Sequence, residues 1–186
     1  ADLAPSTKTL MEAYDDIAPG AFSGRNFRFG VREHAMGAII NGVALYGGFL
    51  PFGATFLVFA DYMRPAIRLA NLMELHTTYV FTHDSIFIGE DGPTHQPVEQ
   101  LASLRIIPNM TVIRPADGPE VAAAWAHALR HEEAPTALVF TRQGLPAIER
   151  DEPFSFEAFN QGAYVVSETA GADPDVVFIG TGSELQ

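Results

Sequence analysis

The stretch Phe81–Pro97 reads FTHDSIFIGEDGPTHQP and follows an apolar run, Tyr79–Phe81. It brings together titratable and turn-forming residues: His83, Asp84, Glu90, Asp91, His95, Gly89, Gly92 and Pro93. A buried strand that ends in a polar loop bent by glycine and proline is typical of α/β proteins, which present functional groups at the carboxyl edge of a parallel sheet. We therefore expect this loop to belong to a functional site.

Strand-length and helix-length segments alternate along most of the chain. Helices are expected at Ser6 to about Ile17, Glu33–Tyr46, Tyr62–Leu75 with Pro65 in its first turn, Val98–Arg105 and Pro119–His131. Strands are expected at Phe27–Gly30, within Phe49–Phe59, and at Thr77–Thr82, Thr111–Arg114, Thr136–Thr141, Gly162–Val166 and Asp175–Gly180. Alternation of this kind predicts the α/β class, with a parallel sheet covered by helices on both faces.

A polar segment, Glu149–Asn160, interrupts the alternation and is interpreted as a linker. We therefore expect one α/β domain over residues 1–150 and the beginning of a second over residues 151–186. The chain starts in a turn without methionine, and its last predicted strand leads into a helix start with Ser183 as the expected cap. Such ends indicate a piece of a longer polypeptide.

The composition argues against several classes of protein. With 47% hydrophobic residues, the chain of 186 residues can bury a sizeable core, and its formal net charge of -12 argues against a nucleic-acid-binding surface. It has no cysteine, which excludes disulfides, a thiolate nucleophile and cysteine-ligated metals. Neither a secretory signal nor a membrane-spanning run of about 18 apolar residues is visible, so a cytoplasmic protein without membrane contact is expected.

Two charged residues stand at predicted ends of secondary structure. Glu33 lies where a short strand turns into a helix, and the helix dipole favours a carboxylate there without any functional role. Arg142 follows a predicted strand and precedes a glycine turn, on the same sheet edge as the loop at 81–97. Its guanidinium can bind a phosphate with two hydrogen bonds or form a structural ion pair, and the residues alone leave both interpretations open.

The aromatic residues Phe56, Phe59 and Tyr62 recur at three-residue spacing. An aromatic stripe with this spacing usually packs in a core. The alternative is a flat slot for the ring of a planar heterocyclic ligand, because aromatic faces stack on one another.

The histidines of the loop raise the question of a bound metal. His83, Asp91 and His95 carry donor groups that zinc accepts, which would suit a metal hydrolase. Their spacing matches no short metal-binding motif, and the turn at 89–93 favours hydrogen bonding to a polyhydroxy or phosphorylated substrate. We therefore expect no metal on these residues and keep the hydrolase as an alternative.

Taken together, these segments resemble the transketolase family. The resemblance rests on FGVREHAMGAIINGVALYGG, ATFLVFADYMRPAIR, THDSIFIGEDGPTHQPVEQLASLRIIPNM, VIRPADGPEV and FTRQGLP, which occur in the family's order and spacing and cover about Ala1 to Pro146. Related thiamine diphosphate enzymes lack this combination, whereas a dihydroxyacetone synthase remains an open alternative. The resemblance implies the pyrimidine-binding domain of a transketolase, followed by the first strands of its C-terminal domain.

For the cofactor, the resemblance implies thiamine diphosphate. Glu33 would be catalytic, because its carboxyl group would hydrogen-bond a ring nitrogen of the aminopyrimidine and share a proton with it. Phe56, Phe59 and Tyr62 would line the slot for that ring. Asp2 corresponds to an acid close to the cofactor in the family.

For the substrate, the resemblance implies a sugar phosphate. His95 would be the second catalytic residue, facing the reacting centre and assisting proton transfers or binding substrate oxygens. Asp91 would hold a sugar hydroxyl. His83, Arg142 and Ser6 would contact the phosphate group.

The family's second half-site has no counterpart in this sequence. The motif GDG…N, which holds Mg²⁺ and the cofactor's diphosphate in the family, does not occur here. In the family the cofactor lies between this domain of one subunit and the diphosphate domain of another. We therefore expect a homodimeric parent enzyme of the pentose phosphate pathway, and no ketol transfer by this chain alone. A non-catalytic interaction domain with the same fold is the alternative from a different class.

Overall fold

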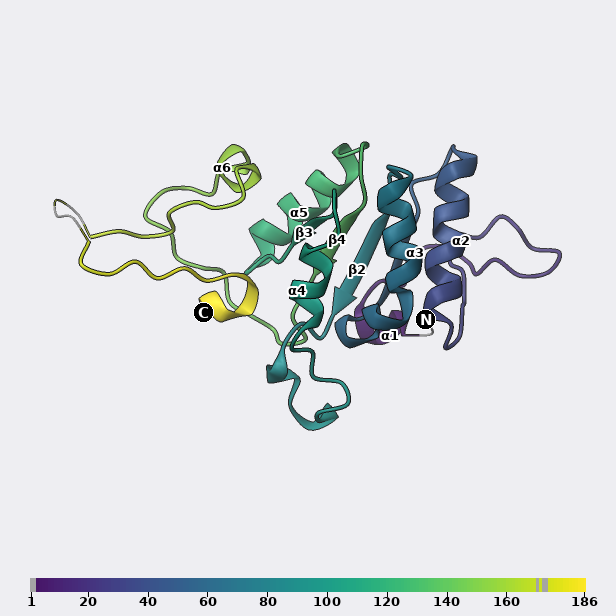
Figure 1. Ribbon diagram of the computed structural model, residues 1–186, viewed down its shortest axis with the longest axis horizontal. Helices are drawn as coiled ribbons and strands as arrows, with labels where there is room; N and C mark the ends of the chain where they lie inside the picture. Colours follow the sequence, from purple (N-terminus) through teal and green to yellow (C-terminus); the bar gives the residue numbers. More distant parts are fainter. Residues whose placement is uncertain (1–2, 170, 172–173) are drawn as a thin grey trace.

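The computed structural model describes residues 3–169, 171 and 174–186 (Figure 1). The helices are α1 (Ala4–Thr7), α2 (Glu33–Tyr46), α3 (Ala60–Leu72), α4 (Gln100–Arg105), α5 (Gly118–Arg130) and α6 (Phe156–Asn160). The strands are β1 (Phe52–Phe56), β2 (Thr78–Thr82), β3 (Thr111–Ile113) and β4 (Thr136–Val139). Short 3-10 helices are η1 (Leu57–Phe59), η2 (Ile86–Asp91) and η3 (Gly182–Leu185).

The strands of the described chain form one parallel sheet in the order β1-β2-β4-β3. Phe56 at the end of β1 pairs with Thr82 at the end of β2, and Val139 at the end of β4 pairs with Phe81. The strands therefore end at one common edge. Because ligands of parallel α/β sheets bind outside the carboxyl ends of the strands, this edge is where a site is expected.

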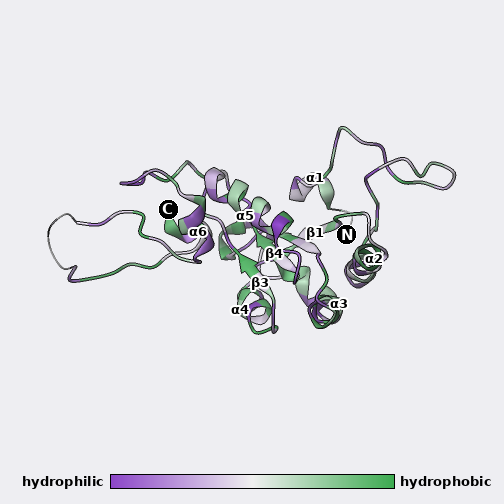
Figure 2. Ribbon diagram, turned by 90° about the horizontal axis from the view of Figure 1, so that it is seen from above, coloured by the Kyte–Doolittle hydropathy of each residue, from purple (hydrophilic) through white to green (hydrophobic). Residues whose placement is uncertain are grey.

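Helices cover both faces of the sheet. Seen from above in Figure 2, α3 and α4 lie on one side of the sheet and α5 lies on the other. Helix α2 packs against α3 and against the edge strand β1. Parallel neighbours need crossover connections, which helices provide here. The predicted fold class, a parallel sheet with helices on both faces, is confirmed.

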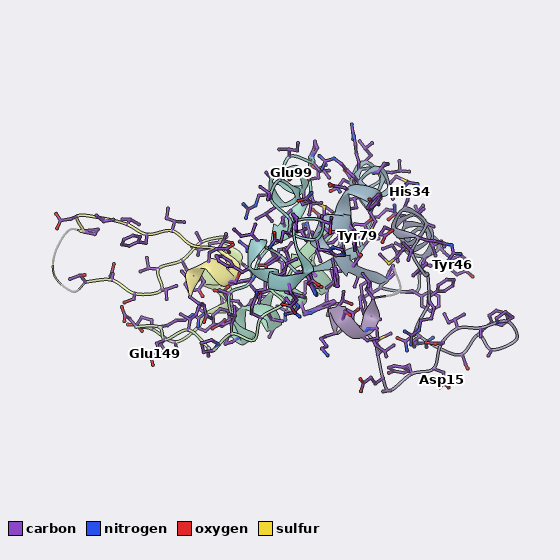
Figure 3. All side chains as sticks on the ribbon, turned by 90° about the horizontal axis from the view of Figure 1, so that it is seen from below. Asp15, His34, Tyr46, Tyr79, Glu99 and Glu149 are labelled. Carbon is purple, nitrogen blue, oxygen red and sulfur yellow. The ribbon has the colours of Figure 1, made fainter. Side chains whose placement is uncertain are left out.

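The central strand β2 is buried along its whole length. Its Tyr79 and Phe81 belong to the main apolar core together with Met63 and Ile67 of α3. Figure 3 shows Tyr79 in the middle of the molecule, where its hydroxyl donates a 2.7 Å hydrogen bond to Asn41 Oδ1 and burial raises its pKa to about 12. A strand buried on both faces explains why this segment is a continuous apolar run.

The predicted helix from Ser6 to about Ile17 is wrong. Helix α1 ends at Thr7, and Lys8 adopts a left-handed conformation with a φ of 55°. The loop that follows is held by the amide side chain of Asn26, which bonds the backbone N–H and carbonyl of Met11 at 3.1 and 3.0 Å. A side chain from a distant position thus satisfies backbone groups that a helix would otherwise pair.

Other boundaries also differ from the sequence-based expectation: α3 ends at Leu72 rather than Leu75, α4 begins at Gln100 rather than Val98, and α5 spans Gly118–Arg130 rather than Pro119–His131. Helix α3 begins at Ala60 rather than Tyr62, because it continues directly from η1, so Pro65 lies in the helix interior and not in the first turn. The expected linker contains α6, whose start is capped by Ser155 Oγ accepting a 3.2 Å hydrogen bond from the Ala158 amide.

Several expected strands are missing from the described residues. No ladder forms at Phe27–Gly30, Gly162–Val166 or Asp175–Gly180, so these three predictions are wrong for this chain. Ser183 lies inside the short helix η3 rather than capping a longer one. Figure 1 shows irregular segments before α2 and after β4, at opposite ends of the molecule. None of the described helices is long and apolar enough to cross a membrane.

Candidate active site

An aromatic wall forms where β1 ends. Phe56 is the last residue of β1, Phe59 ends the helical turn η1, and Tyr62 lies in the first turn of α3. The rings of Phe56 and Phe59 stack with centroids 5.9 Å apart, and Phe59 and Tyr62 follow at 6.1 Å. Exposure rises along the series, from 9% at Phe56 to 65% at Tyr62. Phe56 therefore belongs to the core, whereas Tyr62 lies at an open surface.

Glu33 begins helix α2 and faces this wall. The chain turns into the helix at Gly30, whose φ is 63° and where a Cβ would lie 2.7 Å from Arg32 Nη1. Arg32 in turn donates a 2.7 Å hydrogen bond to the carbonyl of Phe29, which fixes this turn. The Glu33 side chain is buried, yet within the described residues no group hydrogen-bonds or ion-pairs with its carboxylate. A buried carboxylate without a protein partner indicates a place for a ligand donor.

These residues enclose a pocket of about 570 Å³. Its lining consists of Leu3, Val31, Glu33, Phe56, Phe59, Tyr62 and His95. His95 comes from the loop after η2, and its ring meets those of Phe59 and Phe56 edge-on, at 5.4 and 6.3 Å. Ligand pockets with apolar walls and few polar groups have volumes of roughly 300–1,000 Å³, so this one suits a small heterocycle.

His83 lies directly beside the pocket. It follows β2 in a left-handed conformation with a φ of 60°, which costs energy for a residue other than glycine. Its ring stacks on that of Phe56 with centroids 3.6 Å apart, and its Nδ1 lies 3.0 Å from Thr82 Oγ1. Strained conformations of this kind cluster at functional sites, where the surrounding structure enforces them.

Arg142 reaches the loop of η2 from the segment after β4. Its guanidinium lies 3.4 Å from a Glu90 carboxylate oxygen and 3.9 Å from Asp91 Oδ2. The side chain is 43% exposed, so its donors remain partly open to solvent or to a ligand. Gln143 fastens the same loop, because its amide donates to the carbonyl of Phe87. The structure therefore places Arg142 near two carboxylates at ion-pair distances and leaves part of its guanidinium open, so both interpretations of Arg142 stay predictions.

Four of the described residues expected at the site do not line this pocket: Ser6, His83, Asp91 and Arg142. Ser6 is exposed on α1, one turn after Leu3, and does not line the pocket. Asp2 lies outside the described residues. Conversely, Leu3 and Val31 line the pocket but carry no sequence signal, since isolated aliphatic residues in loops look like ordinary surface residues.

The sequence-based expectations also missed the hydrogen bonds of Gln100, which connect two segments of the site. Gln100 at the start of α4 is buried and donates a 2.8 Å hydrogen bond to Asp61, which stands between Phe59 and Tyr62 in the chain. The side-chain oxygen of Gln100, Oε1, accepts a 3.0 Å hydrogen bond from the backbone N–H of Val98, which is close to His95 in the chain. Gln100 thereby ties the aromatic wall to the loop that carries His95.

The metal alternative finds no support among the described residues. No group of three or more histidine and acidic side chains is arranged there to hold a metal ion. His83 and His95 instead make ring contacts with the same phenylalanine, Phe56.

The environment of His83 leads to a pH prediction. Burial is the largest effect and lowers its pKa below 6.5; the Asp91 carboxylate opposes this shift and the Arg142 guanidinium reinforces it. A histidine with a lowered pKa in the folded state takes up its proton more readily when unfolded. The fold is therefore expected to lose stability as the pH falls below about 6.5, whereas above that value His83 adds no penalty.

Thermal unfolding at pH 7.5 and 5.5 tests this expectation. His83→Asn should lose less stability over this interval than the unaltered chain, and asparagine tolerates the left-handed conformation. His34→Asn, at an exposed histidine, serves as the control and should behave like the unaltered chain. Equal losses for both variants would contradict a neutral, buried His83.

The fold and the pocket together define a parallel α/β domain in which a buried carboxylate, without a partner among the described residues, and an aromatic wall lie at the carboxyl edge of the sheet. Comparison with known families agrees with this class: residues 1–147 match the model described as transketolase, pyrimidine binding domain. The chain belongs to the transketolase family.

The similarity to individual relatives covers the whole chain but only part of each relative. The transketolase of Bacillus subtilis (strain 168) is 58% identical over 185 residues, which is 100% of this chain and 28% of the relative. A crystal structure of transketolase from Pichia stipitis in complex with sedoheptulose-7-phosphate matches with a TM-score of 0.86 and 47% identity, over 93% of this chain and 26% of that chain. The chain thus spans little more than a quarter of these relatives.

A third similarity has a lower TM-score and a lower identity than the crystal structure above. A structure described as a split gene transketolase, inactive beta4 tetramer, matches with a TM-score of 0.58 and 30% identity. The match covers 75% of this chain and 41% of that chain.

Proposed function

We propose that this chain holds the aminopyrimidine ring of thiamine diphosphate in a transketolase. The complete enzyme would transfer a two-carbon ketol unit from a ketose phosphate to an aldose phosphate. The observation that carries this proposal is the buried Glu33 carboxylate, which has no partner among the described residues and faces an aromatic pocket. Family membership and the identity of 58% to a transketolase support the same chemistry.

The pocket fits the proposed cofactor. The carboxyl group of Glu33 can hydrogen-bond a ring nitrogen and hold a shared proton there, while Phe56 and Phe59 offer parallel faces for a planar ring. Tyr62 would cover the outer part of the slot. When bound, thiamine diphosphate supplies the carbon nucleophile that takes up the two-carbon unit. Asp2, which lies outside the described residues, is proposed as an acid close to the cofactor.

His95 is proposed as the second catalytic residue. Its half-buried ring stands edge-on to the aromatic wall, and its Nδ1 lies 2.8 Å from Thr94 Oγ1. Since that contact occupies only one ring nitrogen, the other can exchange a proton with a substrate oxygen. Proton transfer by a positioned histidine usually contributes about 100- to 10,000-fold to a rate.

The substrate phosphate is proposed to bind on the open side of the same edge. Arg142 offers a guanidinium that can bind a phosphate in place of its long contacts to Glu90 and Asp91. His83 would donate a hydrogen bond in its neutral form, Ser6 would complete the phosphate contacts, and Asp91 would accept a bond from a sugar hydroxyl.

The proposed enzyme needs a second subunit and a diphosphate-binding domain. Val31 and Tyr62 line the pocket and are 87% and 65% exposed, so one side of the pocket lacks a cover in the described chain. A homodimer with the cofactor at its subunit interface would cover it, and Mg²⁺ would be held with the diphosphate by the other domain. The split gene transketolase described as inactive supports the proposal that these 186 residues are inactive alone.

Some finer expectations stay predictions. These are the pentose phosphate pathway, the cytoplasmic location and the division into domains at residues 1–150 and 151–186. A dihydroxyacetone synthase stays the alternative within the same cofactor chemistry.

Ketol transfer by the complete polypeptide and by the isolated chain tests the proposed function. With thiamine diphosphate and Mg²⁺, the complete polypeptide should convert a ketose phosphate and an aldose phosphate, whereas the isolated 186 residues should show only background. Turnover by the isolated chain would contradict the proposal that it supplies only half of the active site. No turnover by the complete polypeptide would contradict the proposed transketolase activity.

A further inference from the structure

Three distant segments meet at a buried ion-pair cluster beside His83. Arg114 follows β3, Asp84 follows β2, and Glu184 lies in η3 near the end of the chain. Arg114 Nε and Nη2 donate hydrogen bonds of 3.0 and 2.7 Å to Asp84 Oδ2, and Nη2 also donates to Glu184 at 2.7 Å. The Arg114 and Asp84 side chains are only 5% and 1% exposed. A charged pair so fully removed from water is costly unless hydrogen bonds satisfy its polar atoms. Both bonds from Arg114 go to Asp84 Oδ2, and Asp84 Oδ1 has no hydrogen-bond partner among the described residues.

The turn at 181–184 is shaped to lie on Arg114. The carbonyl of Thr181 accepts a 3.1 Å hydrogen bond from Arg114 Nη1. Gly182 has a φ of 62°, and a Cβ there would lie 2.7 Å from Arg114 Cγ, so the backbone packs directly on the arginine side chain. Ser183 Oγ approaches Asp84 Oδ2 at 3.4 Å. Contacts from three consecutive residues of the turn distinguish this docking from a single surface ion pair.

The cluster also anchors the residue that follows the strained His83. His83 holds its left-handed conformation between the stacked ring of Phe56 and the fixed Asp84. Burial by itself lowers the pKa of Arg114, but the hydrogen bonds to Glu184 and Asp84 outweigh it and raise that pKa, so the guanidinium stays charged. Asp84 is thus held by a charged guanidinium that does not belong to the lining of the pocket.

We infer that Arg114 is a positioning residue for His83, acting through Asp84. The turn at 181–184 completes this arrangement by docking on Arg114, and the arrangement is called the clamp below. The inference rests on the proposed function, because it assigns His83 to substrate binding. The arginine itself touches neither the pocket nor the proposed cofactor slot. The segment after residue 150 thereby gains a role at the site: it fixes the orientation of a substrate-binding histidine.

Arg114→Lys in the complete polypeptide, loaded with thiamine diphosphate and Mg²⁺, tests the clamp. Lysine keeps the charge but cannot bind Asp84 and Glu184 with a planar fork. Because a slightly misplaced binding group loses much of its contribution, KM for the sugar phosphate should rise about 10-fold while kcat stays within about two-fold. Glu184→Gln, at the partly exposed end of the cluster, is the milder variant and should raise KM about three-fold.

Arg150→Lys is the matched control. Arg150 is also a buried arginine paired with carboxylates, Asp117 and Glu120, but it contacts no pocket residue. This variant should lower the melting temperature and leave KM unchanged. An equal rise of KM in Arg150→Lys, or an unchanged KM in both Arg114→Lys and Glu184→Gln, would overturn the clamp.

Hydrogen exchange separates this inference from the proposed function. In the same polypeptide, Arg114→Lys should increase deuterium uptake at residues 82–86 more than Arg150→Lys does, whether or not the enzyme turns over. If the unaltered polypeptide shows no ketol transfer, the proposed function fails and the exchange result alone decides whether Arg114 orders the His83 segment. Equal uptake in both variants would then overturn the inference.

Discussion

Glu33→Gln in the complete polypeptide is expected to lower the rate of ketol transfer about 100- to 10,000-fold at saturating thiamine diphosphate. Glutamine preserves the size of the side chain at the start of α2, and Glu33 has no protein partner among the described residues to lose. The substitution would therefore remove the proton that Glu33 is proposed to share with the cofactor, and little else. Steady-state rates with a ketose phosphate and an aldose phosphate measure the effect.

The control for this experiment is Glu132→Gln, an exposed glutamate just beyond α5. It should keep full activity, and both variants should unfold at temperatures close to that of the unaltered protein. Glu33→Gln with more than about a third of normal activity would contradict a proton-transfer role, because such roles contribute far more than a factor of three.

Helix α2 shows what the sequence could predict well. Its expected bounds, Glu33–Tyr46, are those observed, because apolar residues recur at helical spacing and a glycine pair closes the segment. Strands β1 to β4 were also found within their expected segments. These signals are local, so the sequence contains them in full.

The N-terminal loop and the end of the chain show which structures could not be predicted from the sequence. The loop before α2 depends on Asn26, whose partner Met11 is 15 residues away, and the turn at 181–184 depends on Arg114, about 70 residues away. Pairings over such distances leave no periodic trace in the sequence. For the same reason the sequence did not indicate that Arg114 pairs with Asp84.

The candidate site lies between these two cases. Glu33 alone matched a plain helix start, and the stripe of Phe56, Phe59 and Tyr62 alone matched a core. Only the resemblance to a family joined them before the structure did. The fold then supplies the physical reason: β1 ends beside α2 and the loop of His95, so these separate signals converge on one pocket.

The largest expected effect on stability is at Asp117. Its side chain is fully buried, caps α5 by accepting a 3.2 Å bond from the Glu120 amide, accepts a 3.1 Å bond from the Ile148 amide, and pairs with Arg150 at 2.8 Å. Asp117→Ala leaves the buried guanidinium without its main partner and α5 without its cap. Breaking one partner of a buried pair costs about 3–5 kcal/mol of unfolding free energy.

Urea unfolding of the chain measures this cost, because its single tryptophan, Trp125, lies in α5 and reports the loss of that helix. Asp117→Asn keeps the shape and should cost less, about 1–3 kcal/mol. Asp16→Asn, in the exposed pair with Arg28, is the matched control and should cost no more than about 1 kcal/mol. A cost at Asp117 no larger than at Asp16 would contradict the cluster's role in joining α5 to the segment that follows β4.

The pH dependence of the same experiment gives an independent check. Burial alone would raise the pKa of Asp117, but the hydrogen bonds from Arg150 and the Ile148 amide overcome this and lower it below 3.8. A carboxyl group with a lowered pKa in the folded state stabilises the fold above its unfolded pKa and loses that contribution as the pH falls through its folded pKa. The difference between the unaltered chain and Asp117→Asn should therefore be constant near neutral pH and shrink below about pH 3.8, since protonation of the aspartate then removes the same charge that the substitution removes.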